Sequence, residues 1–100
     1  MRNKLTLILI EDDPLACKEL QTYFDACEDM TLIETTNDAN IGLKLVNAHL
    51  PNVVLLDLEL HYGGGNGLIF LDNLKKMPST HSPYIIVTTQ NMSKYTLYQA

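Results

Sequence analysis

The sequence has few of the residues that mark several common protein classes. It has no tryptophan, only two cysteines, and seven lysine and arginine residues against twelve aspartate and glutamate residues, for a formal net charge of -5. No basic cluster exceeds the pair Lys75-Lys76, so we expect no direct contact with nucleic acid. No apolar run approaches the about 18 residues of a membrane span, and no secretory leader pattern is present. We therefore expect a cytoplasmic protein without membrane contact.

The cysteines and histidines do not form a metal-binding pattern. Cys17 and Cys27 fall in one predicted helix, where their spacing prevents a disulfide as long as the helix is intact. His49, His61 and His81 are scattered through predicted loops and share no ligand spacing with the cysteines. We expect no zinc site, and we expect both cysteines to be small, half-buried packing residues.

The chain is long enough for one small domain with a single core. It has 100 residues, of which 46% are hydrophobic and 19% charged, a balance typical of a folded soluble protein. A second domain does not fit in this length. We expect one domain over residues 1–100.

The stretch 53–58 organises the rest of the sequence. It reads Val-Val-Leu-Leu-Asp-Leu, an aliphatic run without alternation that is typical of a parallel strand covered on both faces. Burying the carboxylate of Asp57 is costly unless the charge is paired, bound to a metal or neutralised. Ligands of doubly wound α/β proteins bind at the carboxyl ends of strands, so Asp57 is a candidate functional residue. The alternative is that its carboxylate caps the following loop.

Apolar runs alternate with helical stripes along the whole chain. Strands are predicted over 5–10, 31–36, 53–58 and 84–88, and helices over 14–27, 39–50 and about 68–76. Pro14 suits the first helical position, and the aspartate before it suits an N-cap. A fourth helix is predicted to begin at Asn91 or Ser93. Alternation of this kind predicts a doubly wound α/β fold with parallel strands.

Parallel strands bring their carboxyl ends to one edge of the sheet. The acidic cluster Glu11-Asp12-Asp13, Asp57 and Thr88 should therefore converge. Clustered carboxylates repel one another without a cation, and oxygen ligands alone suit Mg²⁺. Such a site favours phosphoryl chemistry, with an aspartate oxygen as the attacking atom and a hydroxyl as hydrogen-bond donor. The alternatives are an acidic helix-capping loop and an ordinary β-branched strand residue.

Three segments together resemble the receiver domain of two-component response regulators. They are Ile-Leu-Ile-Glu-Asp-Asp-Pro-Leu at 8–15, Val-Val-Leu-Leu-Asp-Leu at 53–58 and Tyr-Ile-Ile-Val-Thr-Thr at 84–89. The resemblance covers the whole chain. It implies a flavodoxin-like, CheY-like fold whose five-stranded parallel sheet has the order 2-1-3-4-5.

The resemblance also implies a role for individual residues. Asp57 would be the phosphoryl acceptor, and its donor would be a sensor histidine kinase or a phosphotransfer protein. Asp12 and Asp13 would hold Mg²⁺ together with Asp57 and the backbone carbonyl of Glu59. Thr88 would be the switch hydroxyl that moves toward the phosphoryl group and biases an equilibrium between two states. The output, expected to be transcriptional, would reside outside this chain.

The sequence departs from the family pattern at three places. His61 stands where the family usually has proline, and a longer glycine-rich loop follows it, which predicts a more mobile loop. Thr89 stands where a small residue is common, and its bulk is expected to screen the acceptor from water and small phosphodonors. No Lys-Pro pair is present, so the lysine at the end of the family's fifth strand has no counterpart.

We therefore interpret the chain as a receiver truncated before its fifth strand, with four of the five βα units. Truncation would leave the strand 84–88 as an open edge. We expect such an edge to pair with a second copy, so a homodimer or higher association through the fourth strand or helix is predicted.

Three other functions compete with this interpretation. A phosphatase of the haloacid dehalogenase type needs a second aspartate two residues after the nucleophile, where this chain has Glu59. A pseudo-receiver would keep the fold and act as a protein-interaction module without accepting phosphate. A flavin or nucleotide carrier lacks support because the glycine-rich loop fits no phosphate-binding motif.

Overall fold

A computed structural model describes residues 4–58, 60, 67–77, 82–89 and 92–99. The elements in chain order are β1 (Leu5–Ile10), α1 (Pro14–Asp25), β2 (Met30–Thr36), α2 (Ala39–His49), β3 (Val53–Asp57), α3 (Gly67–Lys76), β4 (Tyr84–Thr89) and β5 (Met92–Gln99). The bounds of the first seven elements differ from those of the predicted strands and helices by at most two residues. None of the described helices is long and apolar enough to cross a membrane.

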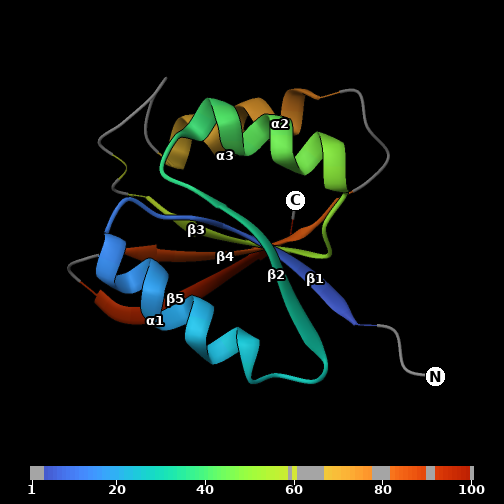
Figure 1. Cartoon of the computed structure of the whole chain (residues 1–100). Coiled ribbons are helices and arrows are strands. Elements are labelled where there is room, and N and C mark those ends of the chain that lie inside the picture. The colour runs from blue at the N-terminus through green and yellow to red at the C-terminus, as the bar shows by residue number, and fades with distance from the viewer. Residues whose placement is uncertain (1–3, 59, 61–66, 78–81, 90–91, 100) are drawn as a thin grey trace.

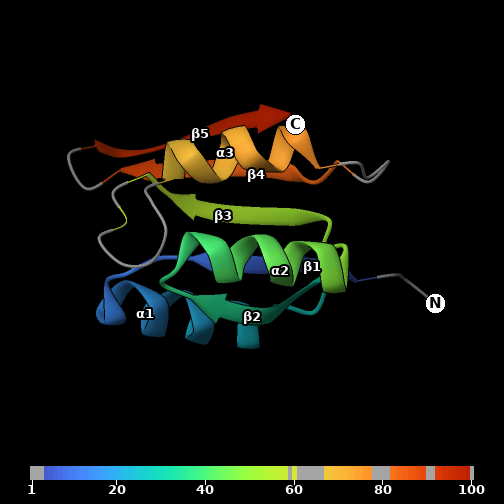
Figure 2. The same ribbon diagram turned by 90° about the horizontal axis from the view of Figure 1, so that it is seen from above.

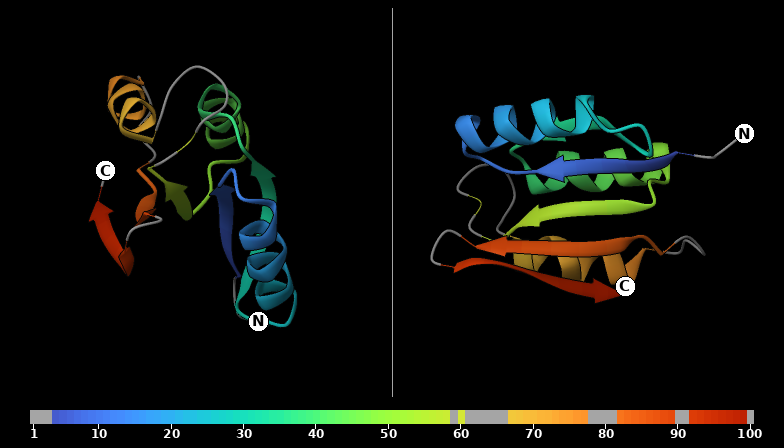
Figure 3. Two further views of the ribbon diagram at one scale, coloured as in Figure 1. Left: turned by 90° about the vertical axis from the view of Figure 1, so that its left-hand side faces the viewer. Right: turned by 90° about the horizontal axis from the view of Figure 1, so that it is seen from below.

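The strands form one sheet in the order β2-β1-β3-β4-β5. Strands β1 to β4 are parallel, as predicted, and their carboxyl ends lie at the same edge (Figure 2). Helices α2 and α3 cover one face of the sheet, and α1 lies on the other face (Figure 1). The end-on view in Figure 3 shows the same three layers. The predicted doubly wound α/β class is confirmed.

The segment after β4 is a strand, and the predicted fourth helix beginning at Asn91 or Ser93 is therefore wrong. Strand β5 pairs with β4 in the antiparallel direction, with Ile86 opposite Leu97. This pairing also removes the premise of the predicted dimer, because the outer edge of β4 is hydrogen-bonded within the chain. Two tyrosines, threonine and leucine lie in Met92–Gln99, and aromatic and β-branched residues favour strands where tertiary pairing is available.

Helix starts follow from local capping chemistry. The side chain of Asp13 accepts a hydrogen bond from the backbone N–H of Leu15 at 3.0 Å, and Pro14 opens α1. The side chain of Asp38 accepts from the N–H groups of Asn40 and Ile41 at the start of α2. Both helices therefore begin at the carboxyl edge of the sheet, beside the ends of β1 and β2.

Alternate residues of the central strands divide the core into two clusters. One cluster lies under α2 and α3, and its buried strand residues are Ile8, Ile10, Val54, Leu56, Ile85 and Val87. The other lies under α1 and contains Leu7, Leu9, Phe24 and Leu55. Burial on both faces is what the unbroken aliphatic runs predict for inner parallel strands.

Two leucines of the predicted helical ranges lie outside the buried helix faces. In α3, Phe70 is completely buried, whereas Leu68 is 60% exposed. Leu50, inside the predicted range 39–50, follows α2 as a left-handed C-cap with φ of 49°. Leu68 lies off the face of α3 that carries the buried residues Gly67 and Phe70, and Leu50 lies beyond the last residue of α2.

Candidate functional site at the carboxyl edge of the sheet

Asp57 is the last residue of β3, and its side chain is buried. It is 2% exposed and follows Leu56, which is fully buried. Asp57 pairs in register with Thr88 on β4, and the N–H of Leu58 donates to the carbonyl oxygen of Thr88 at 3.1 Å. The sequence prediction that these two residues meet at the carboxyl edge is thus reproduced by the register of β3 and β4.

Two further carboxylates gather beside Asp57. Glu11 and Asp12 directly follow β1, the neighbour of β3, and both are half-buried. Each of the three side chains offers a carboxylate oxygen, and these oxygens lie within 4.8 Å of one another. Glu11 is anchored by its own N–H, which donates to the carbonyl oxygen of Thr36 on β2 at 2.9 Å.

Asp13 has a different place from the one that the family resemblance implied. Its exposed side chain caps α1, and among the described residues it does not belong to the carboxylate cluster. Glu11 occupies the cluster instead. The acidic run had indicated all three residues, but choosing Asp12 and Asp13 as the pair missed Glu11. The signal that was available is Pro14, because an aspartate directly before a helix-starting proline is needed as the N-cap.

Glu11 is held in an environment that favours its protonated form. Burial, the hydrogen bond with Asp57 and the negative charges of Asp57 and Asp12 raise the pKa of Glu11 from 4.5 to about 8. Its Oε2 atom also accepts from the backbone N–H of Asp12 at 3.1 Å and of Asp13 at 3.3 Å. Without a cation, this environment favours a proton on Glu11 over a further negative charge in the cluster.

Cys17 lies on α1 close to the acidic cluster. Its thiol contacts the carbonyl oxygen of Glu11, with Sγ 3.5 Å from that oxygen. Burial, followed by the negative charges of Glu11 and its neighbours, raises the pKa of the thiol. The thiol of Cys17 therefore loses its proton less readily than that of an exposed cysteine, which makes it a weaker nucleophile. Cys17 and Cys27 are both free and half-buried, as the sequence predicted.

Some predicted features fall outside the described part of the chain. They are Glu59, whose carbonyl was expected to bind the metal, and His61 with the loop that follows it. The side chain of Thr89, expected to screen the acceptor, is outside it as well.

The three carboxylates suit a small divalent cation. All their donors are oxygen atoms, which Mg²⁺ prefers, and three negative charges within 4.8 Å are most stable around a positive ion. Carboxylates and a cation beside a strand-end threonine are groups that stabilise charge on a transferring phosphoryl group.

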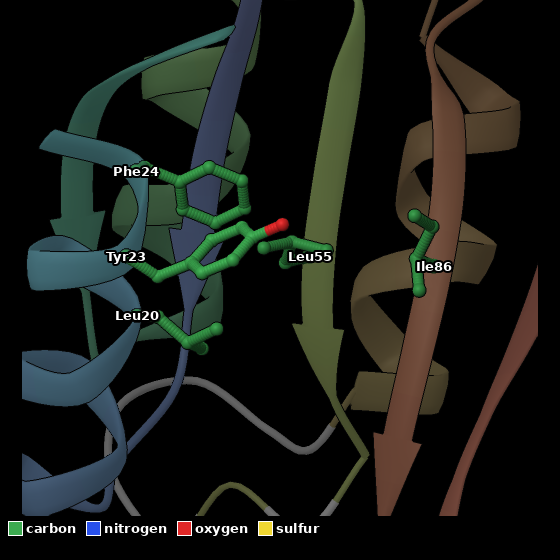
Figure 4. A pocket seen from close by; sticks show the side chains of 5 residues that line it. All are labelled: Leu20, Tyr23, Phe24, Leu55 and Ile86. Carbon is green, nitrogen blue, oxygen red and sulfur yellow. The ribbon is translucent and has the colours of Figure 1, made fainter. Parts of the chain in front are cut away.

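An apolar hollow lies on the face of the sheet that α1 covers. The hollow has a volume of about 470 Å³ and is lined by Leu20, Tyr23, Phe24, Leu55 and Ile86. Figure 4 shows the α1 side chains on one side and Leu55 and Ile86 on the strands opposite. None of these residues carries a carboxylate, so the hollow is chemically distinct from the acidic edge.

Comparison with known proteins identifies the family. The model of the response regulator receiver domain matches residues 7–99. An uncharacterized response regulatory protein of Vibrio vulnificus is 31% identical over 85 residues, which are 85% of this chain and 33% of that protein. The nitrate/nitrite response regulator protein NarL of Escherichia coli is 30% identical over 71% of this chain and 32% of its own length. The chain thus spans about a third of each of these relatives.

Solved structures show the same fold. A two-component response regulator of the LuxR family from Aurantimonas has a TM-score of 0.76 at 17% identity, covering 90% of this chain and 61% of that one. The response regulator domain of Thermotoga maritima CheB also has a TM-score of 0.76 at 17% identity, covering 87% and 61% of the two chains. With four parallel strands, its carboxylate cluster and a family match over residues 7–99, the chain belongs to the response regulator receiver domains.

Proposed function

We propose that this receiver domain accepts a phosphoryl group on Asp57. The observation that carries the proposal is the position of Asp57, which is 2% exposed at the end of β3, with carboxylate oxygens of Glu11 and Asp12 within 4.8 Å. The donor is a phosphohistidine of a sensor histidine kinase or phosphotransfer protein. An oxygen of Asp57 forms the new bond to phosphorus, the bond from phosphorus to the histidine nitrogen breaks, and that nitrogen keeps the electron pair and takes up a proton.

Glu11, Asp12 and Asp57 are the residues proposed to hold Mg²⁺, with the carbonyl of Glu59 as a further ligand. The bound cation supplies charge neutralisation for the phosphoryl oxygens. Asp13 is left out of this ligand set because its side chain caps α1. The proton on Glu11 has to leave when the cation binds, so the cluster exchanges a proton for a metal ion.

Thr88 is proposed as the switch hydroxyl. Its register with Asp57 places it on the neighbouring strand at the same height, and the contact between Leu58 and its carbonyl oxygen ties the two strand ends together. A hydrogen bond from the hydroxyl to a phosphoryl oxygen would favour one of two arrangements at the end of β4.

Control of transcription is proposed as the output of the protein that contains this domain. One relative supports this by name, the transcriptional regulatory protein BtsR of Escherichia coli. Another relative, of Pseudomonas aeruginosa, is named as a protein-glutamate methylesterase, so receivers of this kind also occur in enzymes.

Intact-mass spectrometry tests the phosphoacceptor. The protein is incubated with acetyl phosphate, with Mg²⁺ or with EDTA, and we expect one phosphoryl group to be gained only with Mg²⁺. Asp57→Asn should abolish the gain. Asp38→Asn is the matched control, because Asp38 is also an acidic residue at the carboxyl edge but caps α2, a role that asparagine retains. Failure of the wild-type protein to gain mass would contradict the proposal and favour a pseudo-receiver that acts as an interaction module.

A further inference from the structure

Gly67 lies against the backbone that follows Asp57. It is the first residue of α3, is buried, and donates its N–H to the carbonyl oxygen of Leu58 at 3.2 Å. A Cβ atom at this position would be 2.7 Å from the carbonyl oxygen of Asp57 and 2.7 Å from Cα of Leu58. Both partners are backbone atoms, so no side-chain rotation relieves the overlap. A larger residue at 67 has to displace either α3 or the end of β3.

The same backbone is held from its other side by β4. The N–H of Leu58 donates to the carbonyl oxygen of Thr88 at 3.1 Å, while its carbonyl oxygen accepts from Gly67. The two ends of this short segment are therefore fixed by two different elements. Any movement forced by a side chain at 67 is transmitted to Asp57, whose carbonyl oxygen is itself one of the contacts. In a close-packed interior such a displacement is not absorbed locally.

We propose that Gly67 is a positioning residue for Asp57. It permits α3 to pack directly on the peptide groups of Asp57 and Leu58, and this contact sets where the carboxylate of Asp57 stands relative to Glu11 and Asp12. Gly67 itself touches neither the cation nor the phosphoryl group. The proposal rests on the proposed function: its kinetic readout depends on phosphorylation and its cation readout on the proposed metal site, and these two can fail separately.

Gly42 provides a matched control for adding a methyl group to a tightly packed glycine. A Cβ there would meet Cδ1 of Ile10 at 2.5 Å, Cγ1 of Ile10 at 3.2 Å and Cε1 of Phe70 at 3.3 Å, all of them side-chain atoms, so no backbone atom has to move. Alanine also favours a helix interior over glycine by about 1 kcal/mol, and Gly42 lies inside α2. Gly42→Ala should therefore leave the acceptor site in place, whereas Gly67→Ala should not.

The kinetic experiment measures phosphoryl incorporation from acetyl phosphate with Mg²⁺ for the wild type and both variants. For Gly67→Ala we expect the rate constant to fall about tenfold to a hundredfold, the range expected for a misplaced reacting group. The final extent of labelling should stay close to that of the wild type. Partial unfolding would instead lower the final extent of labelling, while the molecules that stay folded would react with the wild-type rate constant. A rate constant within about twofold of the wild type for both glycine variants would overturn the proposal.

A double variant distinguishes backbone displacement from a side-chain clash. A Cβ at 67 would also lie 3.0 Å from Cδ2 of Leu58, which Leu58→Ala removes. We expect Leu58→Ala combined with Gly67→Ala to remain as slow as Gly67→Ala alone. Recovery of the wild-type rate would show that the side chain was the obstacle and would overturn the positioning role.

Cation binding tests the inference even if the proposed phosphorylation fails. Its NMR readout uses only the wild-type protein and so applies even if Gly67→Ala does not fold. Calorimetric titration with MnCl₂ should show a Kd raised about tenfold in Gly67→Ala and unchanged in Gly42→Ala. In the wild-type protein, Mg²⁺ should shift the amide NMR signals of Gly67 and Leu58 with the same midpoint as that of Asp57. An unshifted Gly67 signal, or equal Kd values in all three proteins, would contradict the proposal.

Discussion

Asp57 and Thr88 are register partners at the carboxyl ends of the neighbouring parallel strands β3 and β4. Their Cα atoms are thus one strand spacing apart, about 4.8 Å. The hydrogen bond from the N–H of Leu58 to the carbonyl oxygen of Thr88 maintains this pairing beyond the last residue of β3. The two residues are therefore held side by side at the carboxyl edge of the sheet.

Thr88→Ala should separate phosphorylation from its structural consequence. We expect the variant to gain a phosphoryl group to at least half the wild-type extent, because Asp57 and the carboxylate cluster are unchanged. Amide hydrogen exchange of β4, which should slow severalfold on phosphorylation of the wild type, should not respond in Thr88→Ala. Thr88→Ser keeps a hydroxyl and should retain the response. Equal responses from alanine and serine would argue against a switch hydroxyl.

Stability without a cation should fall as the pH rises toward 8. The folded pKa of Glu11 is raised to about 8 from 4.5, so between these values the folded state binds more protons than the unfolded state. The free energy of unfolding therefore decreases as pH rises through this window. We expect the Tm in EDTA, followed by circular dichroism, to decline from pH 5 to pH 8 more in the wild type than in Glu11→Gln.

Mg²⁺ should reverse this trend. Because the cation displaces the proton of Glu11, Mg²⁺ affinity should rise with pH up to about 8, and the Tm gained on adding Mg²⁺ should be larger at pH 8 than at pH 6. Identical pH profiles for the wild type and Glu11→Gln would show that Glu11 does not hold the proton.

Substitutions at Asp12 and Asp13 should affect different properties: Mg²⁺ binding at Asp12 and the free energy of unfolding at Asp13. Asp12→Asn should weaken Mg²⁺ binding at least about tenfold, because it removes a charged oxygen ligand. Asp13→Ala should lower the free energy of unfolding by about 1 kcal/mol through loss of the α1 cap. Asp13→Asn preserves the cap and should bind Mg²⁺ within about twofold of the wild type, apart from long-range charge effects. If Asp13→Asn weakened Mg²⁺ binding as much as Asp12→Asn does, Asp13 would be a ligand of the metal.

Two adjacent aromatic residues on α1 should differ in their contribution to stability. Phe24 is 8% exposed and packs on Leu7, Leu9 and Leu55, whereas Tyr23 is 61% exposed at the apolar hollow (Figure 4). Their rings meet edge to face with centroids 5.1 Å apart. We expect Phe24→Ala to cost about 3 kcal/mol and Tyr23→Ala about 1 kcal/mol in urea unfolding. Equal losses in the free energy of unfolding for Phe24→Ala and Tyr23→Ala would mean that the hollow is closed in solution.

Local sequence was sufficient for the seven elements that carry the site. The unbroken aliphatic runs, the aspartate N-caps at 13 and 38 and the alternation of strand with helix are each set by neighbours in the chain. They predicted the parallel sheet and the meeting of Asp57 with Thr88, because parallel strands necessarily share one carboxyl edge. The family resemblance added the acceptor role of Asp57, which stays a proposal.

Packing between distant segments decided the rest. Three acidic residues follow β1. Pro14 marks Asp13 as the helix cap locally, but the meeting of Glu11 and Asp12 with Asp57 depends on the pairing of β1 with β3. The residues 92–99 form a strand because β4 offers them a partner, and their aromatic and β-branched residues favour that pairing without determining it. The need for glycine at 67 depends on backbone atoms ten and nine positions earlier in the chain. Secondary-structure propensity depends on residues that are adjacent in the chain. Close contact between two backbone segments arises only when the sheet and the helices have assembled.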